Sequence, residues 1–199
     1  MRVVLADYGA GNLRSVCSAF ARAGAEPVVS VDPDEVLAAP LAVIAGVGHT
    51  GSAARGLEER GLADALRERA ASGRPLLEIC VGLQLLFGES EEGGRGLGLV
   101  AGRVERLQAR RVPHMGWNRL AVRDGSRLLA GLDGADVYFA HSYACVPEEP
   151  VEAASVEHDG PVVAAVERGS LAGVQFHPER SAAPGARLLE NALAWSRSA

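Results

Sequence analysis

The chain has 199 residues, of which 48% are hydrophobic, and a formal net charge of −5. A chain of this length can bury a substantial core, so we expect a single domain over residues 1–199. The negative charge and the lack of a Lys/Arg run argue against nucleic acid or an anionic membrane as the main partner, and favour a small polar substrate. The start of the chain reaches Asp7 too soon for a secretory signal, and no apolar run is long enough to span a membrane, which predicts a cytoplasmic protein.

The cysteines and histidines give no sign of a disulfide framework or a metal site. The three cysteines are widely spaced and odd in number, so we expect reduced thiols at Cys17, Cys80 and Cys145. Metal-ligand spacing is also missing from four of the histidines, namely His49, His114, His141 and His158.

Apolar runs and helical patterns alternate through the first half of the chain. Buried strands are predicted at residues 3–6, 27–31 and 41–45, and helices at 13–23 and 57–71. Gly24 and Gly73 follow the two helices, as is typical of helix C-termini. The alternation begins like a βαβ unit and predicts a largely parallel sheet.

The second half consists of shorter strand-like runs followed by a helix. Strands are predicted at residues 99–107, 120–123, 137–143, 151–157, 162–166 and 171–175, and a closing amphipathic helix at 184–196. These runs suggest antiparallel or mixed strands added to the parallel sheet. The expected fold is therefore an α/β three-layer sandwich around a mostly parallel sheet with added antiparallel strands.

The segment LLEICVGLQLLF, residues 76–87, predicts a strand that ends at Cys80 and turns into a helix. Such a strand-to-helix elbow presents the thiol above the sheet, where the helix N-terminus favours the nucleophilic thiolate. Val81 N–H and an N–H from the glycine loop at Val47 and Gly48 are candidate donors to an oxyanion. By itself, Cys80 is somewhat better explained as one more small buried residue.

The late segment around His177 changes that balance. A nucleophilic cysteine needs a base, and the base needs an orienting carboxylate, which His177 and Glu179 provide after the last predicted strand. An isolated His-Pro-Glu would more often be a simple polar strand end. Together, the elbow cysteine, the glycine loop and the His-x-Glu segment indicate a nucleophilic site.

The order Cys…His-x-Glu resembles that of the class I (triad) glutamine amidotransferases, which share a flavodoxin-like arrangement. Within that family the chain resembles the glutaminase subunits of imidazole glycerol phosphate synthase (the HisH family) nearly from end to end. The segments that carry the resemblance are DYGAGNL at 7–13, GVGH at 46–49, CVGLQLLF at 80–87, SEE at 90–92, GLGL at 96–99, VPHMGWN at 112–118, YFAHSY at 138–143 and QFHPERS at 175–181. The segments at 7–13, 96–99 and 112–118 distinguish it from amidotransferases of other pathways.

The resemblance implies a glutaminase that supplies ammonia to a partner. Cys80 would attack the carboxamide of L-glutamine, His177 would protonate the departing ammonia and activate water against the thioester, and Glu179 would hold His177. Positions that match glutamine-binding residues of the family are Gln84, Glu92, Ser142 and Tyr143. Positions that match residues facing the partner or gating the ammonia passage are Asn12, Trp117, Asn118, Tyr138 and Arg180.

The implied partner is a (β/α)₈ cyclase subunit, HisF, in a 1:1 heterodimer. That subunit converts PRFAR to imidazole glycerol phosphate and AICAR in histidine biosynthesis. No metal and no organic cofactor is implied.

Each substrate or partner position also has a structural explanation. Trp117 and the tyrosines fit core or strand aromatics, Asn12 fits the N-cap of a helix, and Glu92 fits a solvated surface. Without the resemblance, these structural explanations are preferred.

Three residues depart from the family pattern. Glu78 stands where the elbow usually has glycine, so a carboxylate is expected to lie toward the thiol or to crowd the elbow. Ala45 replaces the usual proline before the glycine loop, and Arg180 replaces the usual lysine after His-Pro-Glu.

Two functional classes therefore remain open, and a third is weaker. The first is an active amidotransferase subunit, and the second is a glutaminase-impaired homologue that acts mainly as a binding partner of the cyclase. A cysteine peptidase or deglycase on a similar fold is a weaker alternative, because the segments at 112–118 and 138–143 have no reason to occur there.

Overall fold

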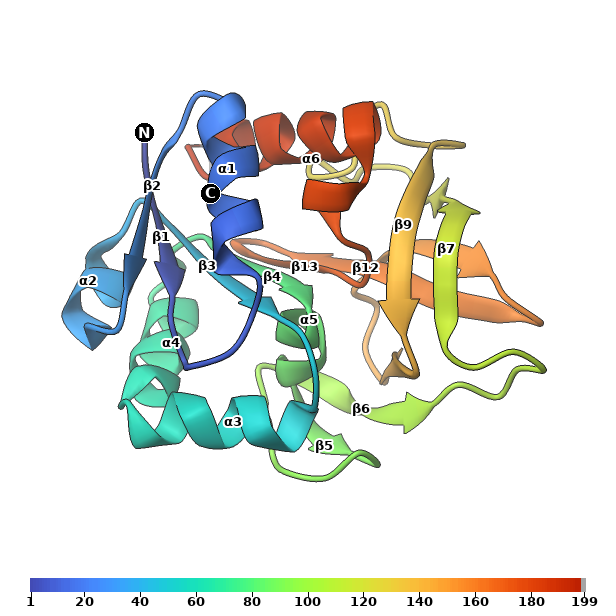
Figure 1. Cartoon of the computed structure of the whole chain (residues 1–199), viewed down its shortest axis with the longest axis horizontal. Coiled ribbons are helices and arrows are strands. Elements are labelled where there is room, and N and C mark those ends of the chain that lie inside the picture. The colour runs from blue at the N-terminus through green and yellow to red at the C-terminus, as the bar shows by residue number, and fades with distance from the viewer. Residues whose placement is uncertain (198–199) are drawn as a thin grey trace.

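The computed structural model describes residues 1–197 and contains a central eight-stranded sheet (Figure 1). The strand order is β2-β1-β3-β4-β13-β12-β11-β8. The parallel strands are β1 (Arg2–Ala6), β2 (Glu26–Ser30), β3 (Leu41–Gly46), β4 (Leu76–Cys80) and β13 (Leu171–Val174). The antiparallel strands that extend the sheet are β12 (Pro161–Arg168), β11 (Glu152–Glu157) and β8 (Ala121–Val122).

Helices cover both faces of this sheet. In Figure 1, α1 (Leu13–Arg22) and α6 (Ala182–Trp195) lie above it, and α3 (Thr50–Glu59), α4 (Leu62–Ala71) and α5 (Val81–Leu85) lie below. The short α2 (Pro33–Ala38) packs against α4. Every residue of β3 and β4 is buried, because parallel strands covered on both faces have no solvated side. The predicted α/β sandwich with added antiparallel strands is confirmed.

Two smaller sheets stand beside the central one, at the end of the molecule away from β2 (Figure 1). One has the order β10-β6-β5 and the other pairs β7 with β9. Their strands are β5 (Phe87–Ser90), β6 (Val100–Arg106), β7 (His114–Arg119), β9 (Asp136–His141) and β10 (Tyr143–Pro147). A 3-10 turn, η1 (Pro178–Arg180), connects β13 to α6.

Two predicted elements are wrong in their bounds. The helix expected at 57–71 is two helices, α3 and α4, because Gly61 adopts a left-handed φ of 68° and breaks the helical path. The strand expected at 137–143 ends at His141, and Tyr143 begins β10 in a different sheet. The sequence analysis also missed α2, β5 and β7.

No helix in residues 1–197 is both long enough and apolar enough to cross a membrane.

Candidate active site

Cys80 ends β4 and directly precedes α5, so the predicted strand-to-helix elbow is present. Its φ and ψ of 57° and −107° belong to a region that non-glycine residues rarely adopt. The helix starts this close to the sheet because residue 82 is glycine. A Cβ on Gly82 would collide with the carbonyl oxygen of Ile44 and lie 2.8 Å from Oε2 of Glu78.

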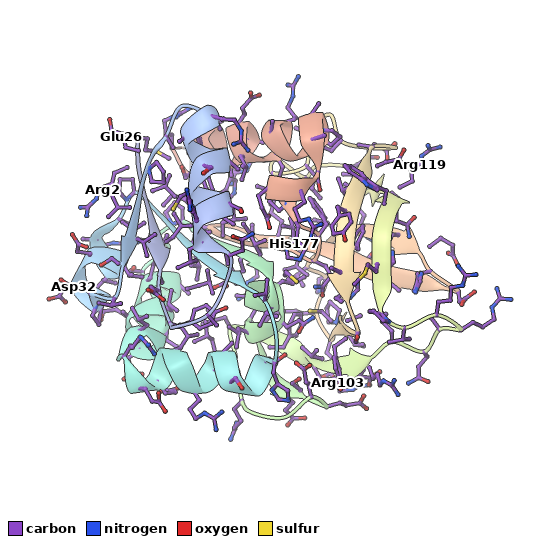
Figure 2. All side chains as sticks on the ribbon, in the orientation of Figure 1. Arg2, Glu26, Asp32, Arg103, Arg119 and His177 are labelled. Atoms are coloured by element: carbon purple, nitrogen blue, oxygen red, sulfur yellow. The ribbon has the colours of Figure 1, made fainter. Side chains whose placement is uncertain are left out.

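His177 and Glu179 lie just after the neighbouring strand, β13, at the start of the turn η1 and within it. β13 pairs with β4 in parallel, so the chain that follows β13 emerges at the same edge of the sheet as Cys80. Nδ1 of His177 lies 2.9 Å from Oε1 of Glu179, and Cys80 lies close enough to His177 to raise the pKa of the imidazole. Figure 2 shows His177 at the centre of the molecule, where the elements that carry these three residues meet.

The surroundings of His177 favour its charged form. Burial lowers the pKa of His177, but its interactions with Cys80 and Glu179 outweigh burial and raise that pKa to about 10. The imidazole is therefore protonated at neutral pH. A protonated imidazole beside a thiol stabilises the thiolate, which is the nucleophilic form of cysteine.

A cavity of ≈ 320 Å³ opens above the thiol and the imidazole. A cavity of this size can hold a small molecule such as a free amino acid. All the residues predicted to form the oxyanion site or to bind substrate line it, namely Val47, Gly48, Val81, Gln84, Glu92, Ser142 and Tyr143.

Thr50, at the start of α3, was missed by the sequence analysis. Its backbone N–H and its hydroxyl donate to Oε2 of Glu92 over 2.7 and 2.8 Å, and the hydroxyl lies 3.0 Å from Oε1 of Gln84. Thr50 is 1% exposed and holds both predicted substrate residues in place. Its position just after the glycine loop was the only signal in the sequence.

Gln175 was also missed as a site residue, although it belongs to the QFHPERS segment. Its side-chain amide accepts from Nε2 of Gln84 over 3.2 Å and donates to Sγ of Cys80 over 3.8 Å. Gln84 Nε2 also donates to the carbonyl oxygen of Tyr143 over 3.0 Å. Gln175 is fully buried and links the nucleophile to the wall of the cavity.

The structure brings three of the predicted partner residues together. The Arg180 guanidinium lies 4.2 Å from the ring centroid of Tyr138, and Trp117 packs edge-on against the same ring at 6.1 Å. Asn118 lies next to Trp117 on β7. Asn12 is the N-cap residue of α1, as its structural explanation predicts, but it is exposed and its side chain makes no capping hydrogen bond.

The comparisons with known proteins agree with this geometry. Residues 4–195 match the family described as glutamine amidotransferase class-I. The chain belongs to this family. A relative from Moorella thermoacetica, named imidazole glycerol phosphate synthase subunit HisH, is 46% identical over an alignment of 194 residues that covers 95% of this amidotransferase and 92% of the relative. A relative of the same name from Rhodospirillum rubrum is 47% identical over an alignment of 213 residues, gaps included, that covers 98% of this chain and 100% of the relative.

These relatives place the amidotransferase in the HisH family. A solved structure described as a glutamine amidotransferase superposes on it with a TM-score of 0.80 at 21% identity, covering 98% of both chains. At this identity, the structural likeness supports the fold alone.

Glu78 of this amidotransferase is fully buried, and both of its carboxyl oxygens have no hydrogen-bond partner among the described residues. Burial raises the pKa of Glu78 well above its ordinary value, which favours the neutral acid. The carboxyl packs against Gly82 in the first turn of α5, and Glu78 is not part of the cavity wall. Glu78 therefore lies beside the elbow at Gly82, and its side chain leaves the cavity open.

Ala45, the second departure from the family pattern, is buried in β3 and accepts a hydrogen bond from the Tyr8 hydroxyl over 3.4 Å. The loop that follows remains at the cavity, since both Val47 and Gly48 line it. Within residues 1–197, no group of three or more His, Cys, Asp or Glu side chains is arranged to hold a metal ion.

Proposed function

We propose that this chain is the glutaminase subunit of an imidazole glycerol phosphate synthase. The observation that carries the proposal is the contact of Cys80 with His177, and of His177 with Glu179, beside a cavity for a small molecule. The HisH relatives of this chain match nearly its whole length. The chain hydrolyses L-glutamine to L-glutamate and ammonia.

Glutamine binds in the cavity with its carboxamide at the elbow. Gln84, Ser142 and Tyr143 line the wall and offer polar groups to the substrate. Glu92, fixed through Oε2 by Thr50, provides negative charge for the substrate ammonium group.

The reaction proceeds through a thioester. Sγ of Cys80 attacks the carboxamide carbon, and N–H groups of Val81 and of the loop at Val47 and Gly48 stabilise the oxyanion. His177 gives its proton to the nitrogen, the C–N bond breaks and ammonia leaves. His177 then takes a proton from water, the hydroxide attacks the thioester carbon, and the C–S bond breaks to release glutamate. Glu179 keeps the imidazole oriented and stabilises its charged form.

Ammonia then passes to a cyclase subunit of the HisF type in a 1:1 heterodimer, which converts PRFAR to imidazole glycerol phosphate and AICAR. The relatives' name, synthase subunit, supports an assembly with a second chain. Residues proposed to face this partner or to gate the ammonia passage are Asn12, Trp117, Asn118, Tyr138 and Arg180. We also propose that residues 1–199 form one domain, that the protein works in the cytoplasm, and that no cofactor, nucleic acid or membrane takes part.

The test is glutamate release from glutamine by the chain alone, with the cyclase subunit, and with the cyclase subunit and its substrate. The Cys80→Ala variant serves as the blank. The proposal predicts strong turnover in the loaded complex and none in the blank. Turnover at the level of the blank in a complex that still forms would contradict it and favour the impaired homologue. Proteolysis of casein by the isolated chain would point to the peptidase alternative.

A further inference from the structure

A line of buried polar side chains joins the small β7-β9 sheet to the candidate active site. His114 on β7 and His141 on β9 are directly opposite each other in the register of the sheet, and they are 4% and 6% exposed. Nδ1 of His114 lies 3.0 Å from Nε2 of His141. Asn118 Nδ2 lies 3.2 Å from Nε2 of His114, and His141 Nδ1 lies 2.8 Å from the carbonyl oxygen of Tyr143.

The two ends of this line fix the direction of every hydrogen bond in it. The amide nitrogen of Asn118 can only donate, so Nε2 of His114 accepts and Nδ1 of His114 carries the proton. That proton is donated to Nε2 of His141, which leaves Nδ1 of His141 to donate to the Tyr143 carbonyl oxygen. Both histidines are therefore neutral and hold the same tautomer, with the proton on Nδ1.

Burial agrees with two neutral rings. Burial and nearby His158 lower the pKa of His114 to about 4. Burial also lowers the pKa of His141 to about 3, against the hydrogen bond to Tyr143, which acts in the opposite direction. Stacking against Phe139 at 4.5 Å and His158 at 4.2 Å fixes the plane of the His114 ring.

The inner end of the line reaches the nucleophile. The carbonyl oxygen of Tyr143 that accepts from His141 also accepts from Nε2 of Gln84 over 3.0 Å. Gln84 binds Gln175, and Gln175 donates to Sγ of Cys80. The outer end is Asn118, which is half-buried and donates its second amide proton to the carbonyl oxygen of Glu157 over 2.9 Å. Trp117, the preceding residue of β7, is 55% exposed on the opposite face of the strand.

We propose that His114 and His141 are positioning residues of the glutaminase, which fix the Tyr143 carbonyl, and through it Gln84, by a one-way hydrogen-bond chain that starts at Asn118. This inference rests on the proposed function. His141 also lines the cavity, but the Nδ1 protons of both rings are held by partners within the line, so the two rings affect how well glutamine is held rather than the chemical step. The hydrogen-bond chain also links the glutamine pocket to the β7-β9 sheet, which carries Trp117.

The tautomers provide a test that needs no substitution. In the wild-type protein with ¹⁵N-labelled histidine at neutral pH, NMR is expected to show two rings protonated on Nδ1 alone. The rings of His49 and His158 act as internal contrasts, since Nδ1 of His49 accepts from Gly51 N–H and Nε2 of His158 donates to the Arg111 carbonyl oxygen, which places a proton on Nε2 in each. A proton on Nε2 of His114 or His141 would overturn the proposal.

Kinetics of the complex with the cyclase subunit test the consequence for glutamine. His141→Asn keeps a donor close to the position of Nδ1, whereas His141→Leu keeps bulk and removes the donor. We expect His141→Leu to raise KM for glutamine by about tenfold or more, a loss typical of one hydrogen bond to a buried acceptor, with a much smaller change in kcat, and His141→Asn to restore most of the KM.

Equal KM changes in the two variants, or none in either, would show that the ring only fills space and would overturn the positioning role. A wild-type complex that releases no glutamate would instead refute the proposed function. The NMR measurement would still decide whether the hydrogen-bond chain exists.

Discussion

His177 shows how one residue's surroundings set its chemistry. It is held between a thiol and a buried carboxylate, and both of these contacts oppose the effect of burial on its pKa. Its charge at neutral pH is therefore a property of the assembled site. The same ring in a peptide would be mostly neutral at pH 7.

Replacing Cys80 with Ala is expected to lower the pKa of His177 from about 10 toward its ordinary range. The reason is that the interaction with Cys80 contributes most to raising this pKa. An NMR titration of the His177 ring in both proteins measures the shift. Cys17→Ala, at a half-buried thiol on α1, is the control and should leave the titration unchanged. A pKa near 10 in the Cys80→Ala variant would contradict this account of the site.

Glu78 is a second residue whose surroundings determine its charge. The pKa of Glu78 in the folded state is raised above its ordinary value of 4.5. The contribution of Glu78 to stability is therefore fully present below pH 4.5 and is lost as the pH rises toward the folded-state pKa. The loss amounts to roughly 1.4 kcal/mol per pH unit until the folded-state pKa is reached. Glu78→Gln, which does not titrate, should therefore gain stability relative to the wild type between pH 5 and pH 8.

Urea unfolding of both proteins at the two pH values measures this difference. Glu59→Gln, at an exposed position on α3, is the control and should show little dependence of the difference on pH. If the difference between Glu78→Gln and the wild type is the same at both pH values, Glu78 is not a buried neutral acid.

At the scale of elements, the buried Arg69 of α4 joins three segments without a carboxylate partner. Its guanidinium donates to the backbone carbonyl oxygens of Val36, Leu37 and Ala39 at the end of α2, and of Pro75 before β4. The carbonyls of Val36 and Leu37 lie in the last turn of α2, where a helix has no backbone donor for them, whereas the Pro75 carbonyl also accepts from the backbone N–H of Ala42 over 3.2 Å. Arg69 thereby fixes the start of the strand that carries Cys80.

Arg69→Met should lower the free energy of unfolding by about 3 kcal/mol or more, because several buried carbonyls lose their donors at about 1–3 kcal/mol each. Arg67→Met on the same helix removes a partly exposed arginine with two surface ion pairs and should cost less than about 1 kcal/mol. Chemical denaturation of the two variants compares the costs. Similar losses in both would show that the carbonyl contacts of Arg69 add little.

The elements that the sequence predicts well are those buried on both faces. β3 and β4 are continuous apolar runs, and their burial follows directly from that pattern. β7 was missed because its sequence, HMGWNR, has no β-branched residue and includes Gly116, so its strand character depends on pairing with β9. The break at Gly61 was missed because glycine is tolerated within helical patterns and only its backbone angle reveals the turn.

The same contrast holds for the site. Cys80, His177 and Glu179 are connected to recognisable local patterns, an elbow and a strand end, so the sequence was enough to select them. Contacts between distant side chains leave no such pattern. His114 and His141 are 27 residues apart and meet only because β7 and β9 pair in one particular register. The hydrogen bonds of His114 and His141 can therefore be identified only from the structure.

At the scale of the whole molecule, Trp117 is exposed on the β7-β9 sheet close to the active-site cavity. Met115, another exposed apolar residue of β7, lines that cavity. Exposed aromatic side chains at the centre of interfaces contribute strongly to binding, so Trp117→Ala should weaken the affinity for the cyclase subunit by at least about tenfold. The isolated variant should keep the wild-type midpoint of thermal unfolding within a few degrees.

Calorimetric titration of the cyclase subunit into each protein measures the effect. Val31→Ala removes an equally exposed apolar side chain at the other end of the sheet, next to β2, and should bind like the wild type. An unchanged affinity of Trp117→Ala would place the partner on another face.

The central claim is that Cys80 forms a covalent bond to the glutamyl group of glutamine. The direct measurement is the intact mass of the chain after the complex with the cyclase subunit is mixed with glutamine and quenched in acid, followed by mapping of the modified peptide. The account predicts a glutamyl adduct on the peptide that contains Cys80, lost on treatment with hydroxylamine and missing from Cys80→Ala. Glutamate release without any such adduct, or with an adduct on Cys17 or Cys145, would contradict it.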